Sequence, residues 1–309
     1  MTATQIPCLD FAHRESAEFA AELSRSFADI GFVALVNHGL SVQLRADAFR
    51  VVSEFFALPL EAKREYFVAN GGGARGYTPF GVETAKDAST PDLKEFYHVG
   101  RELPEEARTS TSDNIWPHEV TGFRDTMLEI YSVLDGIGDC VLCAVAQGLG
   151  LEPGYFSDKT NSGNSLVRAL HYPPLSGDTG GAVRAAPHED INLITLLIGT
   201  PQPGLEVLTK SGQWLEAPSG SELILCNVGD MLQRLTNHEL VSTTHRVVNP
   251  VKERRVQSRY ALPFFLHPNS DFLIETLPGC ITPKNPDRYP VSLSADEFLQ
   301  QRLREIGLI

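Results

Sequence analysis

The stretch 185–198, AAPHEDINLITLLI, sets a histidine and a carboxylate two residues apart directly before an apolar run. The run Ile191–Ile198 is short and is followed by a glycine, which predicts a buried strand. Side chains two residues apart on an extended chain project from the same face, so His188 and Asp190 should lie together at the entrance of this strand. A His-x-Asp pair is common by chance, and its meaning depends on the rest of the chain.

Short β-rich segments surround this stretch after Pro153, separated by Gly, Pro, Asn and Asp. Several short strands at this spacing are typical of an antiparallel sandwich or barrel. Ser294 and Glu297 form a capping box, which predicts a C-terminal helix over Ala295–Arg304. The predicted strands are Ser165–Tyr172, Ile191–Ile198, Gly204–Leu208, Trp214–Glu216, Ser221–Cys226, Val241–Val248 and Arg259–Leu266.

The first half of the chain is predicted to be mainly helical. Apolar residues recur every four positions in Glu15–Asp29, the period of an amphipathic helix, and Val120–Leu149 carries the longest such pattern. Another helix with this pattern is expected to end at Pro59. One short buried strand, Phe32–Val36, interrupts these helices because it is apolar and bounded by turn residues.

This contrast in composition predicts two parts. Residues 1–150 are expected to form an α-rich N-terminal region, and residues 151–309 a β-rich region that contains the His-x-Asp pair. A length of 309 residues is compatible with two folding units at ~150 residues each. Within the first part, residues 70–91 are rich in Gly and Pro, which predicts a mobile loop with Asn70–Gly81 as a lid.

The composition is that of a globular protein with an acidic balance. Hydrophobic residues make up 42% and charged residues 21%, which disfavours disordered and fibrous classes. A net charge of -13 disfavours nucleic acid and anionic membrane surfaces as partners. The N-terminus has no basic, apolar leader, no apolar run reaches the ~18 residues of a membrane span, and five scattered cysteines do not suit a disulfide framework. We therefore expect a cytoplasmic protein with reduced thiols.

A second histidine completes a set of metal ligands. His245 lies within Val241–Val248, another predicted strand. Two histidines and one carboxylate are the facial triad of non-haem Fe(II) oxygenases, which leaves the opposite coordination positions open for substrate and O2. The pattern therefore predicts Fe(II) bound by His188, Asp190 and His245.

The segments around His245 and further downstream carry a family resemblance. HRVVNP at 245–250 and RYALPFF at 259–265 resemble the 2-oxoglutarate/Fe(II)-dependent dioxygenases, in particular the isopenicillin N synthase-like subgroup. The resemblance spans nearly the whole chain. Further matching motifs are Ile6-Pro7 with Leu9-Asp10, Gly31-Phe32 through Asn37-His38-Gly39, Phe55-Phe56 with Leu58-Pro59, Leu166 to Pro174, and Asn227 to Asp230.

The resemblance implies an α+β fold, a double-stranded β-helix or distorted jelly roll flanked by helices, with Fe(II) at one open end. Arg259 matches the arginine that binds the distal carboxylate of 2-oxoglutarate, a role that suits the two parallel donors of a guanidinium. Tyr172 matches a tyrosine whose hydroxyl helps to hold the same cosubstrate. Two positions depart from the family: Ala261 replaces the usual Ser or Thr, and Leu170 replaces the asparagine of plant relatives.

The implied reaction oxidises a C–H bond of a small molecule, most simply to an alcohol, and converts 2-oxoglutarate and O2 to succinate and CO2. Three alternatives stay open: an oxidase of the same fold that does not use 2-oxoglutarate, an ethylene-forming fragmentation of 2-oxoglutarate, and a metal-binding jelly roll without turnover. Arg168 and Arg184 lie near strands that should border the site, and solvated surface positions are the favoured interpretation for both. No feature of the sequence indicates the oligomeric state.

Overall fold

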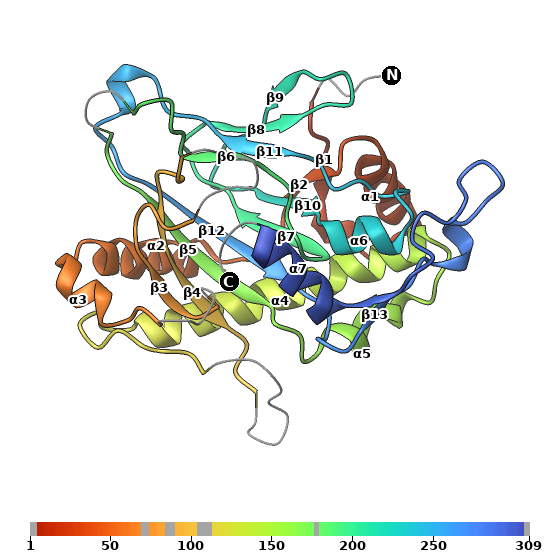
Figure 1. Cartoon of the computed structure of the whole chain (residues 1–309), viewed down its shortest axis with the longest axis horizontal. Coiled ribbons are helices and arrows are strands. Elements are labelled where there is room, and N and C mark those ends of the chain that lie inside the picture. Colours follow the sequence, from red (N-terminus) through yellow and green to blue (C-terminus); the bar gives the residue numbers. More distant parts are fainter. Residues whose placement is uncertain (1–4, 69–73, 84–89, 104–112, 176–178, 306–309) are drawn as a thin grey trace.

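A large, mostly antiparallel sheet forms the centre of the molecule (Figure 1). The computed structural model describes residues 5–68, 74–83, 90–103, 113–175 and 179–305. Eight strands follow one another across the sheet in the order β1-β2-β10-β7-β12-β5-β4-β3. Their bounds are β1 Cys8–Asp10, β2 Phe32–Val36, β3 Gly76–Thr78, β4 Glu95–Gly100, β5 Leu166–Tyr172, β7 Ile194–Ile198, β10 Ile224–Val228 and β12 Arg259–Leu266.

A second, smaller sheet packs against one face of the large one. Its strand order is β6-β11-β8-β9, and an apolar cluster between the sheets joins Val207 and Val247 of the small sheet to Phe32 and Leu170 of the large one. Two facing antiparallel sheets confirm the expected jelly roll. The small sheet consists of β6 Ala185–His188, β8 Leu205–Leu208, β9 Trp214–Glu216 and β11 His245–Val247, and β13 Leu273–Ile274 pairs separately with β14 Leu293–Ser294.

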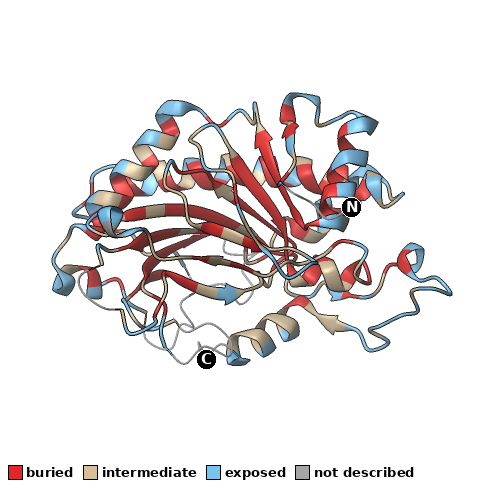
Figure 2. Cartoon of the chain, turned by 90° about the horizontal axis from the view of Figure 1, so that it is seen from above, coloured by how far each residue is buried: buried red, intermediate tan, exposed pale blue. Residues whose placement is uncertain are grey.

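Helices cover the other face of the large sheet (Figure 2), so that its strands are buried on both sides. Phe55, for example, packs edge-on against Tyr97 of β4, with 4.8 Å between ring centroids. Within the described residues, no helix is both long and apolar enough to cross a membrane. The helices are α1 Ala17–Asp29, α2 Val42–Phe56, α3 Leu60–Arg64, α4 Phe123–Gly148, α5 Ser157–Thr160, α6 Asp230–Leu235 and α7 Ala295–Glu305, with short 3-10 turns at Phe11–His13, Pro153–Phe156, Lys252–Arg254 and Pro278–Cys280.

The predicted loop over residues 70–91 contains a strand, which corrects the sequence-based expectation. β3 pairs with β4 at the sheet edge and is buried, so residues 76–78 of the predicted lid belong to the sheet. Gly76 has a φ of 71°, and a Cβ there would lie 2.3 Å from the carbonyl oxygen of Tyr66. Glycine is therefore needed for close packing rather than for mobility. Residues 69–73 and 84–89 lie outside the described residues.

The large sheet combines strands from both halves of the sequence. β2 lies between β1 and β10, and β4 lies between β3 and β5. Four strands of this sheet thus come from before residue 150, and the other four come from after it. The division into two folding units at residue 150 stays a prediction.

Isolated residues 151–309 should accordingly be insoluble. The fragment would lack β2 and β4, leaving the edges of β10 and β5 unpaired and prone to aggregation. It would also expose the sheet face covered by α1, α2 and α4, where burial contributes ~25 cal/mol per Å². Expression of the fragment beside the full chain, followed by thermal melting with circular dichroism, tests this. A soluble fragment that melts cooperatively would contradict it.

Candidate metal centre and cosubstrate pocket

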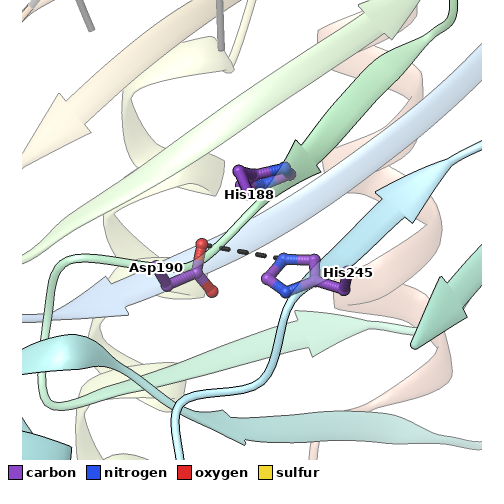
Figure 3. A group of neighbouring side chains, drawn as sticks. All are labelled: His188, Asp190 and His245. Atoms are coloured by element: carbon purple, nitrogen blue, oxygen red, sulfur yellow. Dashed lines mark ion pairs between the residues drawn. The ribbon is translucent and has the colours of Figure 1, made fainter. Parts of the chain in front are cut away.

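His188 and His245 face each other across the small sheet. β6 and β11 are antiparallel, and their register places these two residues opposite each other, with 4.4 Å between the imidazole centroids (Figure 3). His188 is the last residue of β6, a strand that was not predicted from the sequence. The expected position at the entrance of the strand Ile191–Ile198 is therefore wrong, since that strand, β7, begins only at Ile194.

Asp190 follows in the turn after β6 and directs one carboxylate oxygen to the histidines. Its Oδ2 accepts hydrogen bonds from Thr195 Oγ1 at 2.6 Å and Asn227 Nδ2 at 2.8 Å. The other oxygen, Oδ1, lies 3.8 Å from His245 Nε2. One ligand atom from each of His188, Asp190 and His245 can be chosen so that all three lie within 4.8 Å of one another. The structure thus brings together the three residues predicted as metal ligands.

The histidine hydrogen bonds leave the correct nitrogens available. His188 Nδ1 lies 2.7 Å from the carbonyl oxygen of Ala186, and His245 Nδ1 lies 3.1 Å from that of Thr243. A carbonyl only accepts, so each Nδ1 carries a proton, and in the neutral imidazole each Nε2 then has a free lone pair. Burial, together with the nearby His245, lowers the pKa of His188 to about 4, which keeps its imidazole neutral. Two imidazoles that present Nε2 and one carboxylate suit Fe(II).

Arg259 lies at one end of the same pocket, whose empty volume of about 650 Å³ includes open solvent at its mouth. The side chain is buried, with 4% of the residue exposed, and Nη1 donates to the carbonyl oxygens of Gln202 at 3.1 Å and Pro203 at 2.6 Å. Among the described residues no carboxylate forms an ion pair with it, and its buried Nε has no hydrogen-bond partner. A buried cation without a counter-ion is costly, and a dicarboxylate ligand would remove that cost.

Tyr172 and Ala261 belong to the same end of the pocket. Tyr172 pairs with Arg259 in the register between β5 and β12, and its ring centroid lies 5.9 Å from the Arg259 guanidinium carbon. Ala261 lines the pocket two residues further along β12. Leu170, opposite Ala261 on β5, is also apolar. Neither of these two positions supplies a hydroxyl or amide to a ligand.

Ala261→Ser should therefore strengthen 2-oxoglutarate binding. A hydroxyl at this position would add a donor to the wall beside Arg259, and one such hydrogen bond contributes about 0.5–1.5 kcal/mol. The dissociation constant, measured by calorimetry with metal-loaded protein, should fall by up to about tenfold. An unchanged or weakened affinity would show that the pocket does not direct the cosubstrate toward this wall.

Arg184 is buried and Arg168 is half-buried, which corrects the expectation of solvated positions. Arg168 lines the pocket, pairs with Glu83 at 3.1 Å, and has 17% of its side chain exposed. Arg184 is only 3% exposed and donates to the carbonyl oxygen of Gln257 at 3.2 Å, with its guanidinium 5.7 Å from the Tyr172 ring. Burial, and then the nearby Arg259, lower the pKa of Arg184 to about 10.

Three further polar residues of the site were not identified from the sequence. Thr195 orients Asp190, and Lys94 and Glu83 form an ion pair at 2.6 Å beside the pocket. The sequence carried a weak signal for Lys94: Lys94, Phe96 and His98 are spaced two residues apart, so on a strand their side chains would lie on the same face. Thr195 stands four residues after Ile191 inside an apolar run, where a lone hydroxyl is a hint of a buried hydrogen bond.

Thr195→Val should weaken iron binding by about tenfold, because hydrogen bonds that orient a metal ligand typically change affinity by 10–100-fold. The substitution preserves the shape of the side chain but removes the donor to Asp190 Oδ2. Competitive titration of Fe(II) against a chelator measures the effect. Thr160→Val is the matched control, since Thr160 is also buried and its hydroxyl donates to the carbonyl oxygen of Phe156. Equal affinities in the two variants would contradict the prediction.

A jelly roll with this group of ligands and this arginine defines the class of non-haem iron dioxygenases that use 2-oxoglutarate. Two family models match the chain: the non-haem dioxygenase in morphine synthesis N-terminal family over residues 6–119, and the 2OG-Fe(II) oxygenase superfamily over residues 163–268. The chain belongs to the 2OG-Fe(II) oxygenase superfamily and is a 2-oxoglutarate-dependent dioxygenase with Fe(II) as its metal. The first of the two models supports the isopenicillin N synthase-like subgroup.

Individual relatives agree with this assignment. Kihadalactone A synthase LFS from Citrus sinensis is 31% identical over 98% of this chain and 92% of its own length. A 2OG-Fe(II) oxygenase family protein from Caulobacter crescentus is 49% identical, with a TM-score of 0.90 over 98% of this chain and 100% of that one. A full-length Neurospora crassa protein in complex with alpha-KG is 31% identical, with a TM-score of 0.87 over 97% of this chain and 95% of that one, and the same protein has also been crystallised with alpha-KG and thymine.

Proposed function

We propose that His188, Asp190 and His245 hold Fe(II) and that Arg259 and Tyr172 hold 2-oxoglutarate. The two histidines would present Nε2 and the aspartate Oδ1, while Arg259 would bind the distal carboxylate. When bound, the iron supplies the oxygen chemistry that converts 2-oxoglutarate and O2 to succinate and CO2 and oxidises a C–H bond of a small molecule. The residues of the chain contribute ligand placement and a pocket from which water is excluded.

The observation that carries this proposal is the pairing of two incomplete sites within one pocket. The three ligand groups lie within 4.8 Å of one another, and both histidines have Nδ1 at a backbone carbonyl, so that Nε2 remains for a metal. Arg259 is buried with no carboxylate partner among the described residues. A molecule with a carboxylate at each end, chelating the metal through one, satisfies both sites at once.

Succinate release tests the proposed function. The protein is loaded with Fe(II) without oxygen and then exposed to O2 with 2-oxoglutarate and a library of small metabolites. Thymine belongs in the library because the similar Neurospora crassa protein was crystallised with it. We expect succinate formation that depends on 2-oxoglutarate and increases with at least one substrate. Oxygen uptake with substrate but without 2-oxoglutarate would favour the oxidase alternative.

We also propose a cytoplasmic location without a nucleic-acid partner. The net charge of -13 opposes binding to polyanions, and the five thiols are free in the structure, as suits a reducing compartment. Fractionation of source cells with an antibody against the chain checks the location.

A further inference from the structure

The pocket has a second cationic end, away from the one closed by Arg259. Arg168 and Tyr172 stand four residues apart on β5 and line the same cavity, and their Cα atoms are about 13 Å apart at ~3.3 Å per residue. Tyr172 is the register partner of Arg259, so Arg168 is distant from the proposed cosubstrate clamp. A dicarboxylate that extends from Arg259 to the metal has its two charged ends satisfied there and does not need Arg168. This end of the pocket is therefore available to another molecule.

Arg168 belongs to a largely buried cluster whose charges balance. Its Nη1 lies 3.1 Å from Glu83 Oε2, while Lys94 Nζ lies 2.6 Å from Glu83 Oε1 and 2.8 Å from Asp92 Oδ2. Burial alone would raise the pKa of the Glu83 carboxyl, but Arg168 and Lys94 outweigh it and hold that pKa below its ordinary value. Two cations thus face two carboxylates, and the cluster is close to neutral.

One donor of Arg168 is left for a ligand. Nε donates to His98 Nε2 at 2.6 Å, and Nη1 donates to Glu83, but Nη2 has no hydrogen bond to any residue that the structure describes. The guanidinium carbon lies 4.2 Å from the ring centroid of Phe96 and 5.2 Å from that of Phe265. These contacts hold the guanidinium in place at the wall of the cavity, which Phe265 also lines.

We propose that Arg168 binds the primary substrate through Nη2, and that this substrate is a small uncharged molecule with a carbonyl oxygen, such as an amide, lactam or imide. The inference rests on the proposed function and adds the substrate class. A neutral carbonyl accepts the remaining N–H without disturbing the ion pair with Glu83. A carboxylate would instead add a negative charge beside two carboxylates that are already largely removed from water, which is unfavourable. Glu83 is the positioning residue that makes Arg168 select for neutral ligands.

Isosteric pairs of amide and acid test the charge preference. Benzamide with benzoate, and nicotinamide with nicotinate, are titrated by calorimetry into protein loaded with zinc and saturated with 2-oxoglutarate, since zinc is redox-inert and prevents turnover. We expect the wild type to bind each amide at least about tenfold more tightly than its acid. Tighter binding of the acids, or no binding of either amide at millimolar concentration, would overturn the inference.

Glu83→Gln separates charge selection from a structural role. The substitution keeps the shape of the side chain but leaves Arg168 and Lys94 with Asp92 as their one counter-ion among the residues that the structure describes, so the ratio of acid to amide affinity should rise by about tenfold or more. Asp135→Asn is the matched control, because Asp135 pairs with Arg101 at 2.7 Å in a partly buried position away from the pocket. Equal ratios in the two variants would overturn the inference.

If Glu83→Gln does not fold, Arg168→Met tests directly whether Arg168 binds the amide. This variant removes the donor, so amide affinity should fall by about tenfold or more while the affinity for 2-oxoglutarate is retained. Retained amide affinity would overturn the inference. Failure of 2-oxoglutarate to bind the metal-loaded wild type would instead contradict the proposed function, and the two failures are thus distinguishable.

Discussion

His245→Ala should abolish both iron retention and succinate formation. The substitution removes one of three ligand groups and leaves His188 and Asp190, and one imidazole with one carboxylate cannot hold a divalent ion firmly. Since changes beyond the direct ligands already cost 10–100-fold in affinity, loss of a ligand should cost more than about 100-fold. Elemental analysis after anaerobic reconstitution and desalting gives the iron content, and chromatography gives the succinate yield.

The control for His245→Ala is His13→Ala, which removes an exposed histidine at the end of a 3-10 turn. It should retain the iron content and succinate yield of the wild type. Full iron occupancy and full succinate production in His245→Ala would contradict the assignment of this residue as a ligand.

The metal ligands could be predicted from the sequence because their residue types and local spacing carry the chemistry. Their arrangement could not. The position of His188 opposite His245 depends on the pairing of β6 with β11, and register between distant strands is set by tertiary packing. β6 itself is short and contains Pro187, which weakens any strand signal. The same limit applies to Thr195, whose partner Asp190 is revealed only by the fold.

The charged cluster around Arg168 shows a second reason for incomplete prediction. Charged residues are expected at the surface, and Glu83 lies in a Gly- and Pro-rich region that indicated a loop. Lys94 and Asp92 likewise gave no apolar pattern before β4. Each charge is removed from water only because the others neutralise it, so the cluster exists as a property of the folded chain and not of any single segment.

Arg259→Ala should raise the apparent Michaelis constant for 2-oxoglutarate by at least about tenfold, equivalent to about 1.4 kcal/mol. Each hydrogen bond from a guanidinium to a carboxylate contributes roughly 1.5–3 kcal/mol, and the variant would leave the distal carboxylate unpaired in a buried pocket. Succinate formation measured over a range of 2-oxoglutarate concentrations gives the constant. The iron content should stay near that of the wild type, because Arg259 is not among the grouped metal ligands.

Arg259→Lys should recover only part of the lost affinity. Nη1 of Arg259 is already committed to the carbonyl oxygens of Gln202 and Pro203, which fixes the guanidinium plane and leaves the remaining donors for the ligand. A lysine ammonium is a point charge that cannot satisfy those two carbonyls and still present parallel donors to a carboxylate. The expected order of 2-oxoglutarate affinity is therefore Arg, then Lys, then Ala. If Arg259→Ala left the dependence on 2-oxoglutarate unchanged, another cation would have to hold the distal carboxylate, and Arg184, whose guanidinium lies 5.7 Å from the Tyr172 ring, would be the better candidate.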